Sequence, residues 1–147
     1  MIRQTTGYRM TRLTCLATAA LLSACTAATV PEGERIDGID WKMTRLNGLP
    51  WGHDVSLRID GDRLTGVLPC NVYSGAQSGT PPAFGARALS VTELACADPA
   101  RQRAEAEYLA LLPRAEVIER DGNRLVLSGP DLQMTFEPRE ARGDDVF

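Results

Sequence analysis

Residues 55–68 read VSLRIDGDRLTGVL, and this stretch decides the fold. Every second residue from Val55 to Ile59 is apolar, which is typical of a β-strand with one buried face. The Asp-Gly-Asp sequence at 60–62 favours a tight turn, and residues 64–68 return the chain as a second strand. The sequence therefore predicts a β-hairpin, from which an antiparallel sheet extends in both directions.

Strand patterns continue on the N-terminal side of this hairpin. Residues 41–46 predict a strand with Trp41, Met43 and Arg45 on one face. Asn47-Gly48 is a strong turn signal that follows this strand.

On the C-terminal side, residues 74–85 are rich in Gly, Ser and Pro and predict a loop. A further strand then runs from Leu89 toward Cys96. Apolar alternation predicts later strands at 117–118, 125–127 and 132–136, separated by Gly-containing turns. About seven strands are expected in all.

The hydrophobic period changes after Cys96. Asp98 and Pro99 are typical of a helix N-cap and first turn. Apolar residues then recur at helical spacing up to Pro113, which predicts one amphipathic helix of about 14 residues. We therefore expect an α+β fold, a curled antiparallel sheet or open barrel of about seven strands with one amphipathic helix packed on it.

Residues 1–24 are predicted to be a lipoprotein signal peptide. Three arginines precede a short apolar segment at 13–22, which has the length of a signal-peptide core rather than of a membrane span. Leu22-Ser23-Ala24-Cys25 resembles a bacterial lipobox, in which the cysteine thiol receives a diacylglyceryl group and cleavage precedes it. The alternative is an ordinary secretory signal with a chance cysteine at position 25.

The expected mature chain is a lipid-anchored protein with three parts. Residues 25–37 form a tether, residues 38–138 a domain and residues 139–147 a charged tail. Lipidation at Cys25 would attach the chain durably to a membrane. Because Thr26 rather than aspartate follows the cysteine, we expect the periplasmic face of the outer membrane if the cell has two membranes.

Composition excludes some classes of function. The chain has 147 residues, 44% hydrophobic and 24% charged, as expected of one globular domain. Removing the three arginines of the signal peptide from 16 basic residues leaves 13 against 19 acidic residues, a formal charge of −6. An acidic chain of this kind argues against nucleic-acid binding. We also expect the protein to be a monomer.

Two cysteines, Cys70 and Cys96, remain in the expected mature domain. In an oxidising compartment they are predicted to form a disulfide. The alternative is a redox-active or metal-binding pair, although the spacing lacks the close pairing of such motifs.

An ordered set of motifs resembles the META domain, also called the HslJ-like or DUF306 family. The set contains Trp41, Leu46-Asn47-Gly48-Leu49-Pro50, Cys70-Asn71-Val72-Tyr73-Ser74-Gly75, Thr92-Glu93-Leu94-Ala95-Cys96, Glu105 with Tyr108 and Leu112, and Leu125-Val126-Leu127 leading to Phe136. The resemblance covers residues 38–138. Two positions depart from the family pattern: Pro69 replaces a usual glycine, and Ala76-Gln77 replaces a frequent aromatic residue.

The resemblance implies an exported or membrane-attached protein without an established enzymatic activity. Family members are associated with heat-shock response and novobiocin resistance in bacteria, and with virulence or secretion in trypanosomatids. We therefore expect a non-enzymatic envelope protein with a protein partner, acting in envelope maintenance or in stress and drug tolerance. The alternatives are a carrier of a small lipid or metabolite and, more remotely, an undetected hydrolase.

The candidate binding loop comprises Asn71, Tyr73, Gly75 and Trp51. Tyr73 and Trp51 would offer rings to a ligand, whereas the alternative is a structural turn with Tyr73 at one end of the core. His53 is the only histidine, and the chain lacks the motifs that would make it a catalytic base. We expect no catalytic residue, no metal site and no cofactor.

Overall fold

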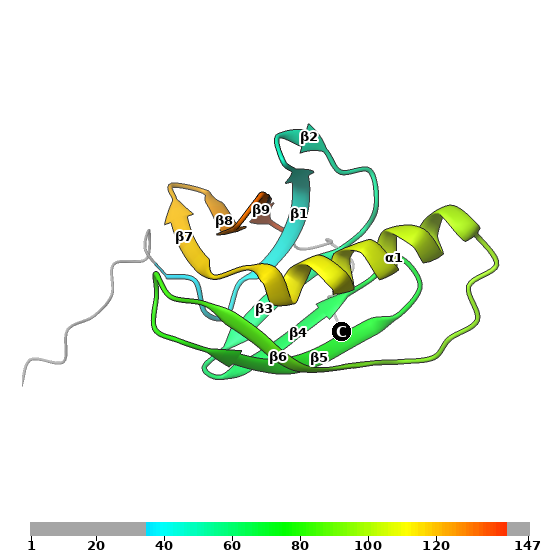
Figure 1. The fold of residues 1–147 in the computed structure, drawn as a ribbon, viewed down its shortest axis with the longest axis horizontal. Coiled ribbons are helices and arrows are strands. Elements are labelled where there is room, and N and C mark those ends of the chain that lie inside the picture. The colour runs from blue at the N-terminus through cyan, green and yellow to red at the C-terminus, as the bar shows by residue number, and fades with distance from the viewer. Residues whose placement is uncertain (1–34, 141–147) are drawn as a thin grey trace, which may run out of the picture.

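Nine strands form one antiparallel sheet in the computed structural model, which describes residues 35–140 (Figure 1). Eight of them follow one another in the spatial order β6-β5-β4-β3-β1-β9-β8-β7, and the short β2 pairs with β1 beside this path. The strands are β1 (Asp40–Leu46), β2 (Leu49–Pro50), β3 (Ser56–Asp60), β4 (Arg63–Val67), β5 (Val72–Ser78), β6 (Gly85–Val91), β7 (Val117–Asp121), β8 (Arg124–Gly129) and β9 (Leu132–Pro138).

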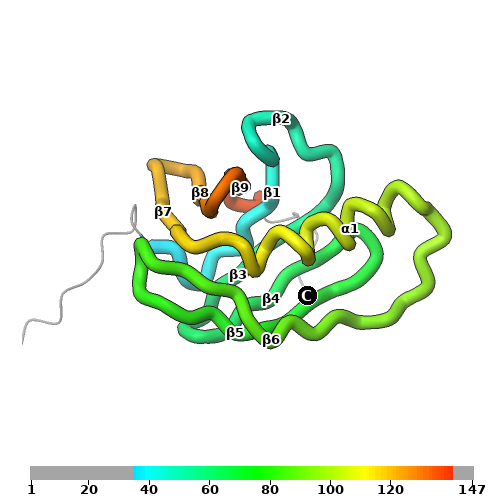
Figure 2. The backbone as a smooth tube through the Cα atoms, in the orientation of Figure 1, coloured from blue at the N-terminus to red at the C-terminus, as the bar shows by residue number. Residues whose placement is uncertain are grey.

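The sheet curls into a half-barrel, and one helical segment packs across its inner face (Figure 2). This segment consists of α1 (Pro99–Leu111) and a short 3-10 turn, η2 (Leu112–Arg114). The side chain of Asp98 caps α1, since its Oδ1 accepts hydrogen bonds from the backbone N–H groups of Ala100 and Arg101. The predicted fold class, with its curled sheet and single helix, is confirmed.

The two ends of the sheet approach each other through the segment before β6. Ala83 forms an isolated bridge with Val117 of β7. The Phe84 N–H donates to Glu116 O at 2.8 Å, and the Ile118 N–H donates to Pro82 O at 2.8 Å. These hydrogen bonds link β6 to β7 at one end, so that the half-barrel encloses a core.

Apolar side chains fill the interior of the half-barrel. Trp41 and Phe136 come from neighbouring strands and Tyr108 from α1, and all three have no exposed surface. Smaller side chains from the sheet and from η2 complete the cluster, including Met43, Leu57, Leu64, Leu112, Ile118, Leu125, Leu127 and Met134. Burial of this apolar surface is the main term that stabilises the fold.

The predicted loop over residues 74–85 is wrong in its first half, because β5 extends to Ser78. Gly and Ser have weak strand preferences in isolation, but β5 pairs with β4 on one side and β6 on the other. Ladder hydrogen bonds on both sides therefore hold this segment extended. The loop begins only at Gly79.

The prediction that Trp41, Met43 and Arg45 share one face of the strand is wrong for Arg45. The register between β1 and β9 shifts between Met43 and Arg45, which indicates a β-bulge. The extra residue reverses the alternation, so that Arg45 is exposed and Leu46 packs against the core. The Asn47-Gly48 turn forms as expected, with both residues at positive φ.

Part of the predicted tether belongs to the folded body. Ile36 packs against the core cluster, and its carbonyl accepts a hydrogen bond of 3.0 Å from the Trp41 indole. Cys25, the predicted signal peptide at 1–24 and the part of the predicted tail beyond residue 140 lie outside the described residues.

Side chains interrupt the ladder between β3 and β4. Backbone pairing ends at Arg58 and Thr65. Beyond this point the Ser56 hydroxyl accepts a hydrogen bond from the Val67 N–H at 3.0 Å. The Tyr73 hydroxyl donates to the Ser56 carbonyl at 3.0 Å. Because this hydrogen bond holds the Tyr73 hydroxyl at Ser56, the Tyr73 ring lies against Gly66. There is no space for a side chain at Gly66.

We predict that Gly66→Ala strongly destabilises the protein. A Cβ atom at this position would lie 2.0 Å from Ser56 O and 2.5 Å from Tyr73 Cε1, so that backbone or ring must move. We expect a loss of at least about 1–3 kcal/mol in the free energy of unfolding, measured by urea denaturation. Gly52→Ala is the matched control, because a Cβ there meets nothing within 4 Å. Equal stability of the two variants would contradict the close contact.

Candidate functional site

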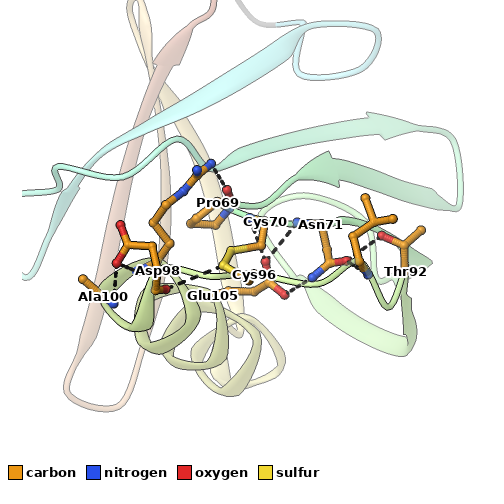
Figure 3. The surroundings of a disulfide bond; sticks show 10 residues. Pro69, Cys70, Asn71, Thr92, Cys96, Asp98, Ala100 and Glu105 are labelled. Atoms are coloured by element: carbon orange, nitrogen blue, oxygen red, sulfur yellow. Dashed lines mark hydrogen bonds between the residues drawn. A yellow bond between two sulfur atoms is a disulfide. The ribbon is translucent and has the colours of Figure 1, made fainter.

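The Cys70-Asn71 segment before β5 is held by one carboxylate of helix α1 (Figure 3). Glu105 Oε2 accepts hydrogen bonds from the backbone N–H groups of Cys70 and Asn71, each at 3.1 Å. Glu105 Oε1 accepts a third from the Asn71 side-chain amide at 2.7 Å. Hydrogen bonds to an ionised acceptor are stronger than neutral ones, so this carboxylate fixes the segment to the helix.

Asn71 also connects the segment that follows β6. Its Oδ1 atom accepts hydrogen bonds from the Thr92 hydroxyl at 2.9 Å and from the Leu94 N–H at 2.7 Å. The side chain is 9% exposed, and both its amide nitrogen and its oxygen have partners within the protein. Asn71 therefore joins β5, α1 and the chain leading to Cys96.

The predicted disulfide between Cys70 and Cys96 is present, with the two Cα atoms 5.6 Å apart. It lies beside the Glu105 carboxylate, and Arg101 of α1 donates a hydrogen bond to the neighbouring Pro69 carbonyl (Figure 3). A cross-link over 26 residues restricts the unfolded chain and is worth roughly 3–4 kcal/mol on the chain-entropy estimate. The disulfide and the Glu105 carboxylate thus both hold the Cys70-Asn71 segment, which is the junction between α1 and the start of β5.

Tyr73 forms a second connection between sheet and helix. Its hydroxyl lies 2.7 Å from the hydroxyl of Tyr108, and the two rings meet edge to face at 5.7 Å. Burial raises the pKa of Tyr73 well above its ordinary value, and the neighbouring Tyr108 raises it further. Burial likewise raises the pKa of Tyr108, and its hydrogen bond with Tyr73 only partly offsets this. Both hydroxyls are therefore protonated at neutral pH.

Gly75 is a point of close approach between β5 and β6. A Cβ atom there would lie 2.6 Å from Leu89 Cδ2 and 2.9 Å from Arg87 O. The absence of a side chain lets Leu89 pack against the core from the adjacent strand. Asn71, Tyr73 and Gly75 thus each have a structural role, and a binding role for them stays a prediction.

Trp51 lies apart from these three residues, in the loop between β2 and β3. With His53 and the α1 residue Arg103 it lines a groove of about 250 Å³ against the helix. The Trp51 and His53 rings meet edge to face at 5.7 Å. The indole nitrogen of Trp51 is buried and has no hydrogen-bond partner among the described residues.

The outer face of strands β3–β6, which points away from α1, carries a larger groove of about 650 Å³. We call it the outer groove, and the side chains that line it include Asp40, Ser56, Arg58, Arg63, Thr65, Val67, Val72, Ser74, Ser90 and Thr92. The sequence pattern does not predict this groove, because the groove depends on which outward side chains the strand registers place together. Short hydroxyl side chains form its floor, and Val67 and Val72 are 37% and 48% exposed.

Two further observations concern only residues 35–140. No group of three or more His, Cys, Asp or Glu side chains is arranged to hold a metal ion in this part of the chain. No helix in the same range is long and apolar enough to cross a membrane.

Comparison with known protein families identifies the class of this fold. The META domain family matches residues 34–141, which is most of the chain and includes the whole described sheet. The chain therefore belongs to the META domain family, as its ordered motifs suggested. A search of curated proteins gave no match.

Solved structures share the fold at low sequence identity. A protein from Burkholderia xenovorans, solved by NMR, is 19% identical with a TM-score of 0.59, over 78% of this chain and 94% of that chain. A crystal structure of a DUF4847 family protein from Bacteroides vulgatus is 12% identical with a TM-score of 0.54, over 73% of this chain and 96% of that chain. At these identities the likeness extends to the fold alone.

We predict that Glu105→Gln destabilises the junction between α1 and β5. The amide keeps one oxygen acceptor but loses the charge and the second acceptor that together serve three N–H groups. We expect a loss of about 1–3 kcal/mol in the free energy of unfolding, measured by urea denaturation. Glu107→Gln removes the same charge from an exposed position on the same helix. An equal effect of both variants would show that helix charge, not the junction, is responsible.

We also predict a specific loss of stability at alkaline pH. Unfolded tyrosines titrate near pH 10, whereas the folded pKa values of Tyr73 and Tyr108 are raised. Their contribution to stability is fully present below about pH 10 and falls as the pH rises above it, by up to about 1.4 kcal/mol per pH unit for each group. Urea unfolding between about pH 8 and 11 measures this fall, which Tyr73→Phe should make shallower. An unchanged slope in that variant would refute the assignment.

Proposed function

We propose that this protein is a lipid-anchored, non-enzymatic component of the cell envelope that binds a protein partner through the outer groove. Membership of the META domain family accounts for the fold. The proposed lipid anchor and envelope location are supported by residues 1–25, which contain three arginines, an apolar segment and a lipobox-like sequence. The proposed role is in envelope maintenance or in stress and drug tolerance.

The observation that carries this proposal is the contrast between the filled interior and the open outer groove. The interior contains the side chains of Trp41, Tyr108 and Phe136, each fully buried. A carrier of lipids or metabolites would need space there, so this alternative loses its main support. The outer groove instead offers exposed apolar and polar side chains together, as protein contact surfaces do.

The geometry around His53 also favours binding over hydrolysis. A histidine base needs an acidic residue to orient it and a nucleophile within reach. Asp54, the neighbouring acid, is engaged by Arg139 at 2.8 Å, and the ring of His53 packs against Trp51. These contacts give both residues structural partners.

Site-specific photo-crosslinking in the native membrane tests the proposal. A photoreactive residue at Val72 lies in the outer groove, whereas one at Gln133 occupies an equally accessible position on β9. We expect one recurrent protein to be captured from Val72 and not from Gln133, identified by mass spectrometry. Capture of the same proteins from both positions would contradict a specific surface.

The anchor is tested separately with Cys25→Ser. If lipidation is required, this variant leaves the membrane fraction and fails to restore the phenotype of a deletion strain. Full restoration by the unanchored chain would argue against a membrane-tethered role.

A further inference from the structure

We infer that the outer groove binds an extended peptide segment that carries acidic side chains and an apolar residue about four positions away. This inference rests on the proposed function, and names the chemistry of the partner that the groove would accept. It follows from the side-chain rows that strand register builds on the outer face of β3–β6.

The first observation is a row of polar side chains that crosses five strands, β1 and β3–β6. Asp40 lies opposite Arg58, Arg58 opposite Thr65, Thr65 opposite Ser74, and Ser74 opposite Ser90. Directly opposite residues in antiparallel strands share one face, so one carboxylate, one guanidinium and three hydroxyls form a continuous line. Hydroxyl groups both donate and accept hydrogen bonds, so a peptide that runs along β4 crosses this line and meets partners there for its amide groups.

The second observation is the charge of the adjoining row. Asp60 lies opposite Arg63, Arg63 opposite Ala76, and Ala76 opposite Arg87. Asp60 is engaged by Arg58 at 2.8 Å, whereas no hydrogen bond or ion pair of the Arg63 side chain is found within the described residues. The two rows thus hold three guanidinium groups against the carboxylates of Asp40 and Asp60, an excess of one positive charge.

This local positive charge contrasts with the formal charge of the whole chain, which is −3. On the outer face of the other half of the sheet, Lys42 lies opposite Glu137, so that opposite charges face each other. A local excess of arginine on an acidic protein favours an anionic ligand, and the guanidinium fork matches a carboxylate.

The third observation is an apolar end to the groove. Val67 and Val72 lie opposite each other and remain 37% and 48% exposed. Val67 and Arg63 are four residues apart on the same strand, which separates them by about 13 Å. A single ligand that reaches both must therefore place an apolar group and an acidic group about four extended residues apart. This spacing favours a peptide over an isolated phosphate or carboxylate.

Fluorescence anisotropy with two labelled peptides tests the inference on the full chain, purified from membranes in neutral detergent. One octapeptide carries valine and glutamate four residues apart in a threonine–serine background, and the other has lysine in place of glutamate. We expect the glutamate peptide to bind at least about tenfold more tightly, with an affinity that falls as NaCl is raised. Equal binding of both peptides, or no binding up to about 1 mM, would overturn the inference.

Charge-neutral variants locate the site. Arg58→Gln combined with Arg63→Gln should weaken binding of the glutamate peptide at least about tenfold. Arg103→Gln combined with Arg124→Gln is the matched control, since it removes the same charge from two exposed residues of α1 and β8 that do not line the outer groove. Thermal melting establishes that all variants are folded. An equal loss in this double control would show that net charge alone attracts the peptide, and would refute the site.

Vesicles of phosphatidylglycerol provide the remaining comparison. Binding of vesicles that depends on Arg58 and Arg63, without binding of the glutamate peptide, would replace the peptide by an anionic membrane surface and overturn the inference. If crosslinking from Val72 still captures one protein when the glutamate peptide fails to bind, the proposed function survives and only the acidic peptide is excluded.

Discussion

The hydroxyl of Tyr73 is the contact on which the arrangement of sheet and helix depends. It joins the Ser56 carbonyl of β3 to the Tyr108 hydroxyl of α1, and it does so in a fully apolar environment. An unsatisfied polar group in such a place costs about 1–3 kcal/mol, so each of the three partners holds the others in position. The Tyr73 ring lies against Gly66, where a larger residue would not fit. The backbone ladder between β3 and β4 ends before this point, at Arg58 and Thr65.

Helix α1 contacts the inner face of strands β3–β6, and through the register of β5 it also affects the outer face. On the inner face, Glu105 and Tyr108 hold the start of β5 at two neighbouring points. This anchorage fixes the register of β5 against β4 and β6, and register determines which side chains meet on the outer face. The Cys70-Asn-x-Tyr-x-Gly motif therefore supports a surface whose side chains belong mostly to other residues.

The sequence alone predicts the fold where local pattern and tertiary packing agree. The hairpin at 55–68, the capped helix and the final strands are of this kind, since their apolar periods match the faces they bury. Prediction fails at Ser74–Ser78, where pairing on both sides outweighs weak strand preference, and at Arg45, where a bulge reverses the alternation. The outer groove arises from cross-strand register, which depends on contacts distant in sequence, such as Glu105 with Asn71.

The segment from Pro82 to Phe84 covers an edge strand of the sheet and so limits its pairing with other protein molecules. An incompletely closed sheet leaves edge strands whose free N–H and C=O groups invite pairing with another molecule. Here Pro82 occupies the outer edge of β7, and the register shift of β6 coincides with positive φ at Ala88, which interrupts a regular edge. The half-barrel thereby protects itself against edge-to-edge aggregation at both ends of the sheet, without forming a closed barrel.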